Sequence, residues 1–165
     1  MAELTNLESK LGEVIGLAMA AQGATEKVKK LVQEEDEELA HTLERMHEEA
    51  SEAERRSTDV AGQLDGKKTA ILEKARETKR EATDMMSTYL GDDADALDGF
   101  EFLTMAEAGE VGHWSIVDVL SARAGNRAVQ ELAAWQKPIQ ERHLREAMQG
   151  SLRLAEHEDP NGSAE

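Results

Sequence analysis

Two short segments of the chain place a glutamate three residues before a histidine. The pairs are Glu44 with His47 and Glu110 with His113. On a helix this spacing sets a carboxylate and an imidazole one turn apart on the same face, and the two ligand types together suit iron, manganese or zinc. The chain has no cysteine, so any metal site must be built from carboxylate, imidazole or amide groups.

Polar residues also interrupt the apolar stripes of two expected helices, over residues 94–124 and 126–156. The spacing of three and four residues puts these polar groups on the faces that pack into a core. The interruptions in the first of these helices are Glu110 and His113, with Glu107 beside them, and those in the second are Gln136 and His143, with Gln140 beside them.

If these two helices form an antiparallel hairpin that turns at Gly125, residues at equal distances from Gly125 along the sequence lie at one height. Glu110 then faces Gln140, and His143 lies level with Glu107. Burying a carboxylate without compensation costs several kcal/mol, so a cation, a proton or hydrogen-bond donors must satisfy Glu110. We therefore expect a polar layer that either binds a metal or forms a hydrogen-bonded network fixing the helix register.

The rest of the sequence predicts the helices that position this layer. Helix-forming residues dominate, aromatic residues make up only 3% of the chain, and there are two prolines. Glycine and aspartate residues separate the segments and provide caps, including an N-cap at Asp36 and a bend near Gly23 with a cap at Thr25. The sequence predicts one all-α domain over residues 1–158 and a frayed tail over 159–165, with helices over 3–32, 36–64, 67–90, 94–124 and 126–156.

The first three helices carry stripes without a charge. In the first helix Gly12 and Gly16 lie behind the stripe, where they would let another helix come close. The stripe of the third helix consists of Ile71, Ala75, Thr78, Ala82, Met85 and Tyr89. We expect each stripe to face the core. The acidic residues Glu48, Glu49, Glu52 and Glu54 are interpreted as a solvated face.

In this layout the chain resembles the ferritin-like superfamily, and more closely the small bacterial stress proteins of the YciF type. The resemblance covers about residues 4–154: a helical hairpin, a long crossover that the helix over 67–90 supplies, and a second hairpin. It implies an all-α, ferritin-like four-helix bundle with an additional crossover helix.

The resemblance also implies a dinuclear iron or manganese site with carboxylate and histidine ligands. Carried over by position, the ligands are Glu13, Glu44, His47, Glu107 or Glu110, Gln140 and His143, with His113 as an additional candidate. The implied activity is oxidation of Fe(II), or disposal of peroxide in stress protection. The sequence departs from the family pattern at Gln140, where many relatives have Glu, and at Glu13 and Glu44, which lie away from their apolar stripes. A half site or no site is therefore an alternative.

The sequence is also compatible with other functions. The protein could be a non-catalytic structural or stress-associated interaction protein that keeps the fold without the metal. A histidine phosphotransfer bundle needs an exposed histidine, whereas His113 and His143 are both expected to face inward. The segment Gly150-Ser151-Leu152-Arg153 resembles the tail by which ferritin-like cargo docks into encapsulin shells, but the apolar stripe continues to Leu154, which favours ordinary helix.

The net charge of −16 argues against nucleic acid or an anionic membrane as a partner, because both would be repelled. No apolar segment approaches the roughly 20 residues that a membrane-spanning helix needs. The polar start of the chain lacks the features of a secretion signal, which favours a cytoplasmic location. A homodimer is expected, since long helices with spare small and apolar positions commonly pair.

Overall fold

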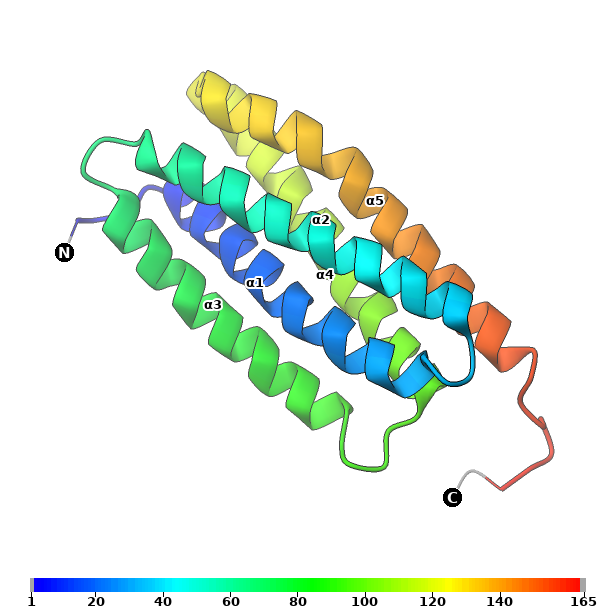
Figure 1. The fold of residues 1–165 in the computed structure, drawn as a ribbon. Coiled ribbons are helices and arrows are strands. Elements are labelled where there is room, and N and C mark those ends of the chain that lie inside the picture. Colours follow the sequence, from blue (N-terminus) through cyan, green and yellow to red (C-terminus); the bar gives the residue numbers. More distant parts are fainter. Residues whose placement is uncertain (1, 164–165) are drawn as a thin grey trace.

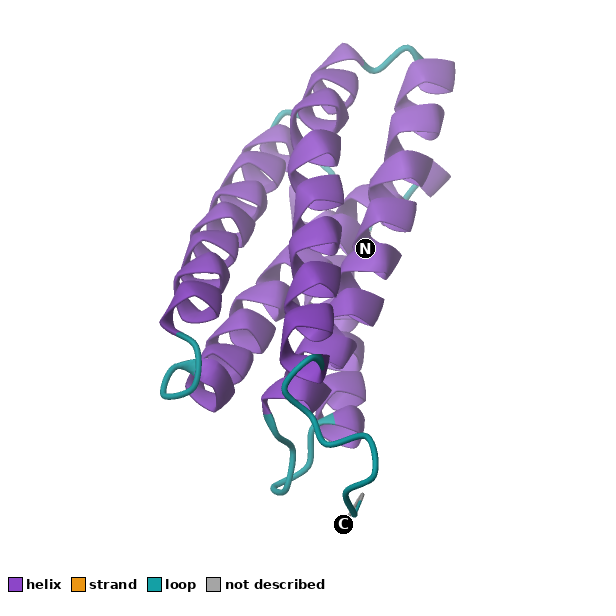
Figure 2. Cartoon of the chain, turned by 90° about the vertical axis from the view of Figure 1, so that its right-hand side faces the viewer, coloured by secondary structure: helices purple, strands orange, loops and turns teal. Residues whose placement is uncertain are grey.

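The computed structural model describes residues 2–163, in which it contains five α-helices and no strand (Figures 1 and 2). The helices are α1 (Asn6–Val32), α2 (Glu37–Gly62), α3 (Lys68–Tyr89), α4 (Ala96–Ala124) and α5 (Arg127–Ala155). All five helices predicted from the sequence are confirmed, and their bounds differ by three residues or fewer. The expected tail follows α5 without further helix up to residue 163, and residues 164–165 lie outside the described range.

Four of the five helices begin at a residue whose side-chain oxygen accepts a hydrogen bond from a backbone N–H of the first turn. These N-caps are Thr5, Asp36, Asp95 and Asn126. Such caps satisfy N–H groups that have no partner inside the helix, and each contributes about 1 kcal/mol. The N-cap predicted at Asp36 is thus confirmed.

The hairpin of α4 and α5 turns at Gly125. Its φ of 65° lies in the left-handed region, which a glycine adopts without steric cost. Asn126 follows directly and caps α5 through a hydrogen bond from the backbone N–H of Val129. Local chemistry therefore makes this a tight, antiparallel hairpin, as the sequence predicts.

The expected bend at Gly23 is not present as a break in the helix, because α1 continues from Asn6 to Val32. Thr25 does not start a fresh turn: its hydroxyl donates a hydrogen bond to the backbone carbonyl of Ala21 at 2.8 Å. Similarly, α5 continues through Pro138. The Gly150–Arg153 segment belongs to α5, which confirms the prediction of ordinary helix there.

Helix α1 packs against α2, α3 and α4, while α5 packs against α4 and α2. Figure 1 shows α3 at the edge of the molecule beside α1, where it runs the length of the bundle and connects the end of the first hairpin to the start of the second. The two hairpins are thus in contact, and α3 lies outside them.

Gly12 and Gly16 are the points where α3 approaches α1. A Cβ atom built on Gly12 would lie 2.8 Å from the backbone oxygen of Ile71, and one on Gly16 would lie closer still to the backbone oxygen of Ala75. Both distances are shorter than real Cβ contacts. The predicted role of the two glycines is confirmed, and the helix that they admit is α3.

The outer half of the α3 stripe does not face the core as expected. Ile71, Ala75 and Thr78 are buried, but Met85 is 54% exposed and Tyr89 is 59% exposed. The close approach at the glycines involves only the first half of α3. Its second half forms one wall of a groove, which Met85 lines, and the Tyr89 ring lies at the surface with its centroid 6.1 Å from that of the Phe102 ring of α4.

The buried apolar residues form two clusters at different heights of the bundle. One contains Val28, Leu43, Phe100 and Leu103, and the other contains Leu11, Ile15, Ile71, Trp114 and Val129. Along α4 and α5, the segments between the clusters carry the buried polar residues. Within residues 2–163, no helix combines the length and apolar character needed to cross a membrane.

The glycine contact between α1 and α3 can be tested by substitution. Gly16→Leu should lower the free energy of unfolding by roughly 1–3 kcal/mol, because the new side chain overlaps the α3 backbone. Gly23→Ala is the matched control, since nothing lies within 4 Å of its Cβ position, and it should raise stability by roughly 0.5–1 kcal/mol. Urea unfolding measures both changes, and equal effects would contradict the proposed packing.

Candidate functional site

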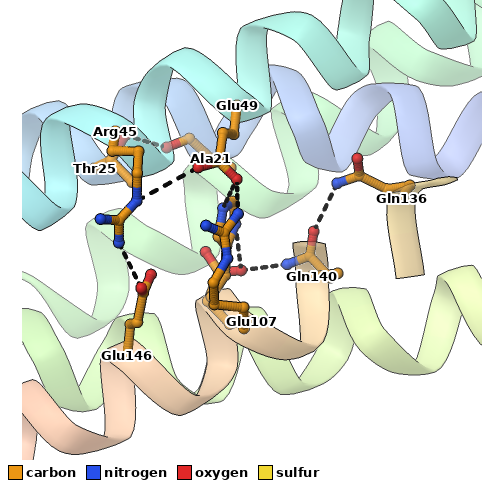
Figure 3. Close-up of polar contacts among 10 residues, drawn as sticks. Ala21, Thr25, Arg45, Glu49, Glu107, Gln136, Gln140 and Glu146 are labelled. Carbon is orange, nitrogen blue, oxygen red and sulfur yellow. Dashed lines mark hydrogen bonds and ion pairs between the residues drawn. The ribbon is translucent and has the colours of Figure 1, made fainter. Parts of the chain in front are cut away.

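The buried polar layer is centred on Glu107 of α4 and His143 of α5, each of which is 2% exposed. Figure 3 shows the layer. The Glu107 carboxylate accepts a short hydrogen bond from the Gln140 amide, and its Oε2 lies 3.6 Å from His143 Nδ1. On the other side of the imidazole, His143 Nε2 lies 3.2 Å from Oε2 of Glu49 on α2. The imidazole therefore bridges two carboxylates from different helices.

The arrangement agrees with the expected hairpin register for His143 and differs from it for Gln140. His143 lies level with Glu107, as predicted. Gln140, however, bonds to Glu107 and not to Glu110. Three residues advance a helix by about 300°, so Glu110 is rotated by about 60° from Glu107. That rotation turns Glu110 away from α5, toward a groove lined by residues of α1 and α3.

Glu110 is a buried carboxyl group without a hydrogen-bond donor. It is 6% exposed, and within the described residues no hydrogen bond or ion pair reaches it. It lines a groove of about 290 Å³ whose other walls are mostly apolar and include Ala21, Thr78 and Met105. Burial, and then the charge of Glu107, raise the pKa of Glu110 well above its ordinary value. Glu110 therefore holds its proton more tightly than an exposed glutamate does.

His143 holds its proton more tightly than an ordinary histidine because of its neighbours. Burial lowers the pKa of His143, but the hydrogen bond and charge of Glu107, together with the charge and hydrogen bond of Glu49, outweigh burial and raise the pKa above its ordinary value. When protonated, the imidazole is a cation that compensates the two carboxylates beside it.

Glu49 was not predicted as part of the site. It was assigned to a solvated acidic face, but its side chain is only 21% exposed and accepts hydrogen bonds from Arg142 and His143. Arg45 also lies 3.4 Å from its Oε1. A sequence signal existed: Glu49 follows Met46 of the apolar stripe by three residues, which places it at the edge of the buried face.

His113 was expected to face inward, but the structure places it at the edge of the bundle, partly exposed. Its side chain is 36% exposed, its Nε2 lies 3.5 Å from Glu13 Oε2, and its Nδ1 lies 2.8 Å from the backbone oxygen of Gly109. It comes one turn after Glu110 and is rotated further toward solvent. Glu13 also pairs with Lys10 at 2.6 Å, so Glu13 and His113 belong to a cluster near the surface and not to the central layer.

Glu44 and His47 also lie apart from the central layer. Glu44 is 52% exposed at its side chain and pairs with Lys29 of α1 at 3.3 Å. The Nδ1 atom of His47 lies 3.0 Å from the backbone oxygen of Gln22. The Glu44–His47 pair of α2 therefore contacts α1 on the outer side of the first hairpin, away from the polar layer.

The residues present do not fit the dinuclear centre that the resemblance implies. To the polar layer the first hairpin contributes Glu49, which is paired with Arg142 and His143, while Glu13, Glu44 and His47 make other contacts. Within residues 2–163, no three histidine, aspartate or glutamate side chains are arranged so that they could hold a metal ion. A ligand set within the second hairpin, around Glu107, Glu110, His143 and Gln140, remains a prediction.

Comparisons of the chain with protein-family models, with curated proteins and with solved structures found no match. The resemblance to the ferritin-like superfamily therefore rests on the layout of the helices and remains a prediction.

Glu110→Gln should raise the free energy of unfolding at about pH 8 and change it little at about pH 4. The pKa of Glu110 is higher in the folded chain than its ordinary value of 4.5, so the stability linked to its proton is complete below that value and is lost as the pH rises through the folded-state pKa. Glutamine keeps the shape but cannot ionise. Urea unfolding across this pH range measures the difference, with the exposed Glu141→Gln as control; parallel curves for the wild type and Glu110→Gln would refute the assignment.

Proposed function

We propose that the protein is a metal-binding protein of ferritin-like architecture that holds one iron or manganese ion in the polar layer of the second hairpin. Glu107 and His143, which already lie side by side, would be ligands, with Gln140 and Glu49 adjacent. Glu110 would join them by turning from the groove that it lines, because within residues 2–163 no three such side chains are arranged to hold an ion as they stand. The proposal rests on the state of Glu110, a buried carboxyl group that has no hydrogen-bond donor and lies beside a second buried carboxylate. A proton lowers the cost of burying such a group, and a divalent metal can take the place of the proton.

The order and packing of the helices support the architectural part of the proposal. The α1–α2 hairpin and the α4–α5 hairpin are in contact, and α3 runs the length of the bundle between them in sequence (Figure 1). One long crossover between two hairpins is the connectivity of ferritin-like folds. Metal sites in such folds are built from side chains that project inward near the middle of the helices, where Glu107 and His143 lie.

Metal binding would have to displace protons from this layer. Both ring nitrogens of His143 face carboxylates, at 3.2 Å and 3.6 Å, so one nitrogen must give up its proton and become available as a ligand. Glu110 must also ionise. Affinity should therefore increase as the pH rises.

The proposal covers binding only. Oxidation of Fe(II) and disposal of peroxide at a dinuclear centre need a second set of ligands, and the carboxylate that the first hairpin brings to this layer, Glu49, is already paired with Arg142 and His143. We assign no oxidation step to these residues.

A second candidate function, a structural or interaction protein without a metal, is favoured by the extent of hydrogen bonding around His143. Gln140 donates to Glu107, and Arg142 and His143 both contact Glu49. This network joins α2, α4 and α5 and satisfies most of its members. It could fix the helix register with a proton as its only cation.

Metal binding is tested by equilibrating chelator-treated protein with Mn(II), and with Fe(II) under anaerobic conditions, followed by elemental analysis. We expect one ion per chain, with an affinity that rises with pH. Glu110→Gln and His143→Gln should each reduce the affinity roughly tenfold or more. The matched controls are Glu44→Gln and His47→Gln, which change the same residue types outside the layer. Absence of binding to the folded wild type, or equal losses in the controls, would reject the proposal.

The structural alternative makes its own prediction about Glu49 and His143. In a double-mutant cycle with Glu49→Gln and His143→Gln, the two residues should show a coupling energy in the unfolding free energy of roughly 0.5–3 kcal/mol, because each removes the partner of the other. The coupling should shrink as the pH rises and His143 loses its charge. Additive effects at every pH would show that the network does not connect α2 to α5 energetically.

A further inference from the structure

One exposed face of α4 carries no charge over about four turns. The residues on this face, which we call the α4 seam, are Met105, Gly109, Gly112, Ile116 and Val119. Met105 is 42% exposed, Ile116 is 44% exposed and Val119 is 57% exposed. Their spacing of four, three, four and three residues is the spacing of a line along one side of a helix that packs against another helix.

The seam makes α4 apolar on two sides. Its inner side already buries Phe100, Leu103, Trp114 and Val117 in the bundle. A helix that is apolar all round is normally covered all round, and a contiguous exposed apolar strip is typical of an interaction surface. In a chain with a net charge of −16, an uncharged strip of this length is an unusual part of the surface.

The two glycines of the seam have no role inside the chain. Nothing lies within 4 Å of the Cβ position of Gly109 or Gly112, whereas the Cβ positions of Gly12 and Gly16 are blocked by α3. A glycine inside a helix costs about 1 kcal/mol relative to alanine. At the middle of the seam the pair forms a shallow notch, in which a second helix can approach the α4 backbone closely.

The ends of the seam carry opposite charges. Asp98 and Glu101 lie at its N-terminal end, and Arg123 lies at its C-terminal end. Within the described residues, neither Glu101 nor Arg123 forms an ion pair, although both are exposed. An antiparallel copy of the same seam would bring the acidic end of one helix to the basic end of the other.

We propose that the α4 seam is the interface of a homodimer in which the α4 helices of two copies pack antiparallel about a two-fold axis. Gly109 then faces Gly112 of the second copy, and Met105 faces Ile116 of the second copy. The same register places Asp98 opposite Arg123 of the second copy, with Glu101 one turn away. Because the axis repeats every contact, one surface serves both subunits.

Charge favours a second copy over other occupants of the seam. Two chains of −16 repel each other, so they can associate only through a strip that is uncharged and has complementary ends. Antiparallel pairing meets both conditions, whereas parallel pairing would place Arg123 beside Arg123. An anionic lipid surface offers no partner for the acidic end.

The interface is tested by sedimentation equilibrium of the full chain, with circular dichroism as the check on folding. The wild type should be a dimer, and Ile116→Asp should be a folded monomer. Leu152→Asp is the matched control, because Leu152 is 62% exposed on α5 outside the seam, and it should remain dimeric.

A charge exchange tests the antiparallel register. Glu101→Arg and Arg123→Glu should each weaken the dimer roughly tenfold or more, since each puts like charges together at both ends of the interface. The double variant E101R/R123E restores opposite charges and should recover wild-type association. A monomeric wild type, a dimer unaffected by Ile116→Asp, or a double variant as weak as the single variants would each overturn the proposal.

Discussion

The contact of His143 with Glu107 and Glu49 is the constraint around which the middle of the bundle is organised. Glu107 lies where an isolated charge would cost several kcal/mol, and it is retained because Gln140 donates to it and the imidazolium lies on its other side. Glu49 completes the compensation from α2. Three helices meet at one imidazole, so their relative heights are fixed by hydrogen-bond geometry as well as by apolar packing.

The polar layer limits the size of the side chains that α1 and α2 can place beside it. Two apolar clusters lie on either side of it, and at its height α1 and α2 contribute Ala18, Ala21 and Ala50. Small residues there leave room for the long side chains of α4 and α5. Sliding α5 by one turn along α4 would separate His143 from Glu107. The layer thus adds hydrogen-bond geometry to apolar packing in fixing the helix register.

The sequence allowed prediction of the helices, the turn at Gly125 and the level of His143 with Glu107, because capping, glycine conformation and helical periodicity are local properties. It did not allow prediction of which neighbouring helix each polar side chain faces. Glu110 and His113 lie on the apolar stripe with Glu107 beside it, yet each turn after Glu107 rotates them further toward α1 and solvent. Glu49 was assigned to the surface because an acidic run looks the same whether or not a histidine from another helix reaches its edge.

The position of α3 has a consequence for access to the interior. It packs mainly against α1, most closely at Gly12 and Gly16, and makes few contacts with α2 or α4. Its second half forms one wall of the groove that Glu110 also lines, and Met85 on that wall is exposed. Movement of this half away from α4 would widen the opening to Glu110 while the two hairpins stayed packed. The packing of Met86 on the core, the hydrogen bond from Lys27 to the Leu90 carbonyl and the Tyr89–Phe102 ring contact all oppose that movement.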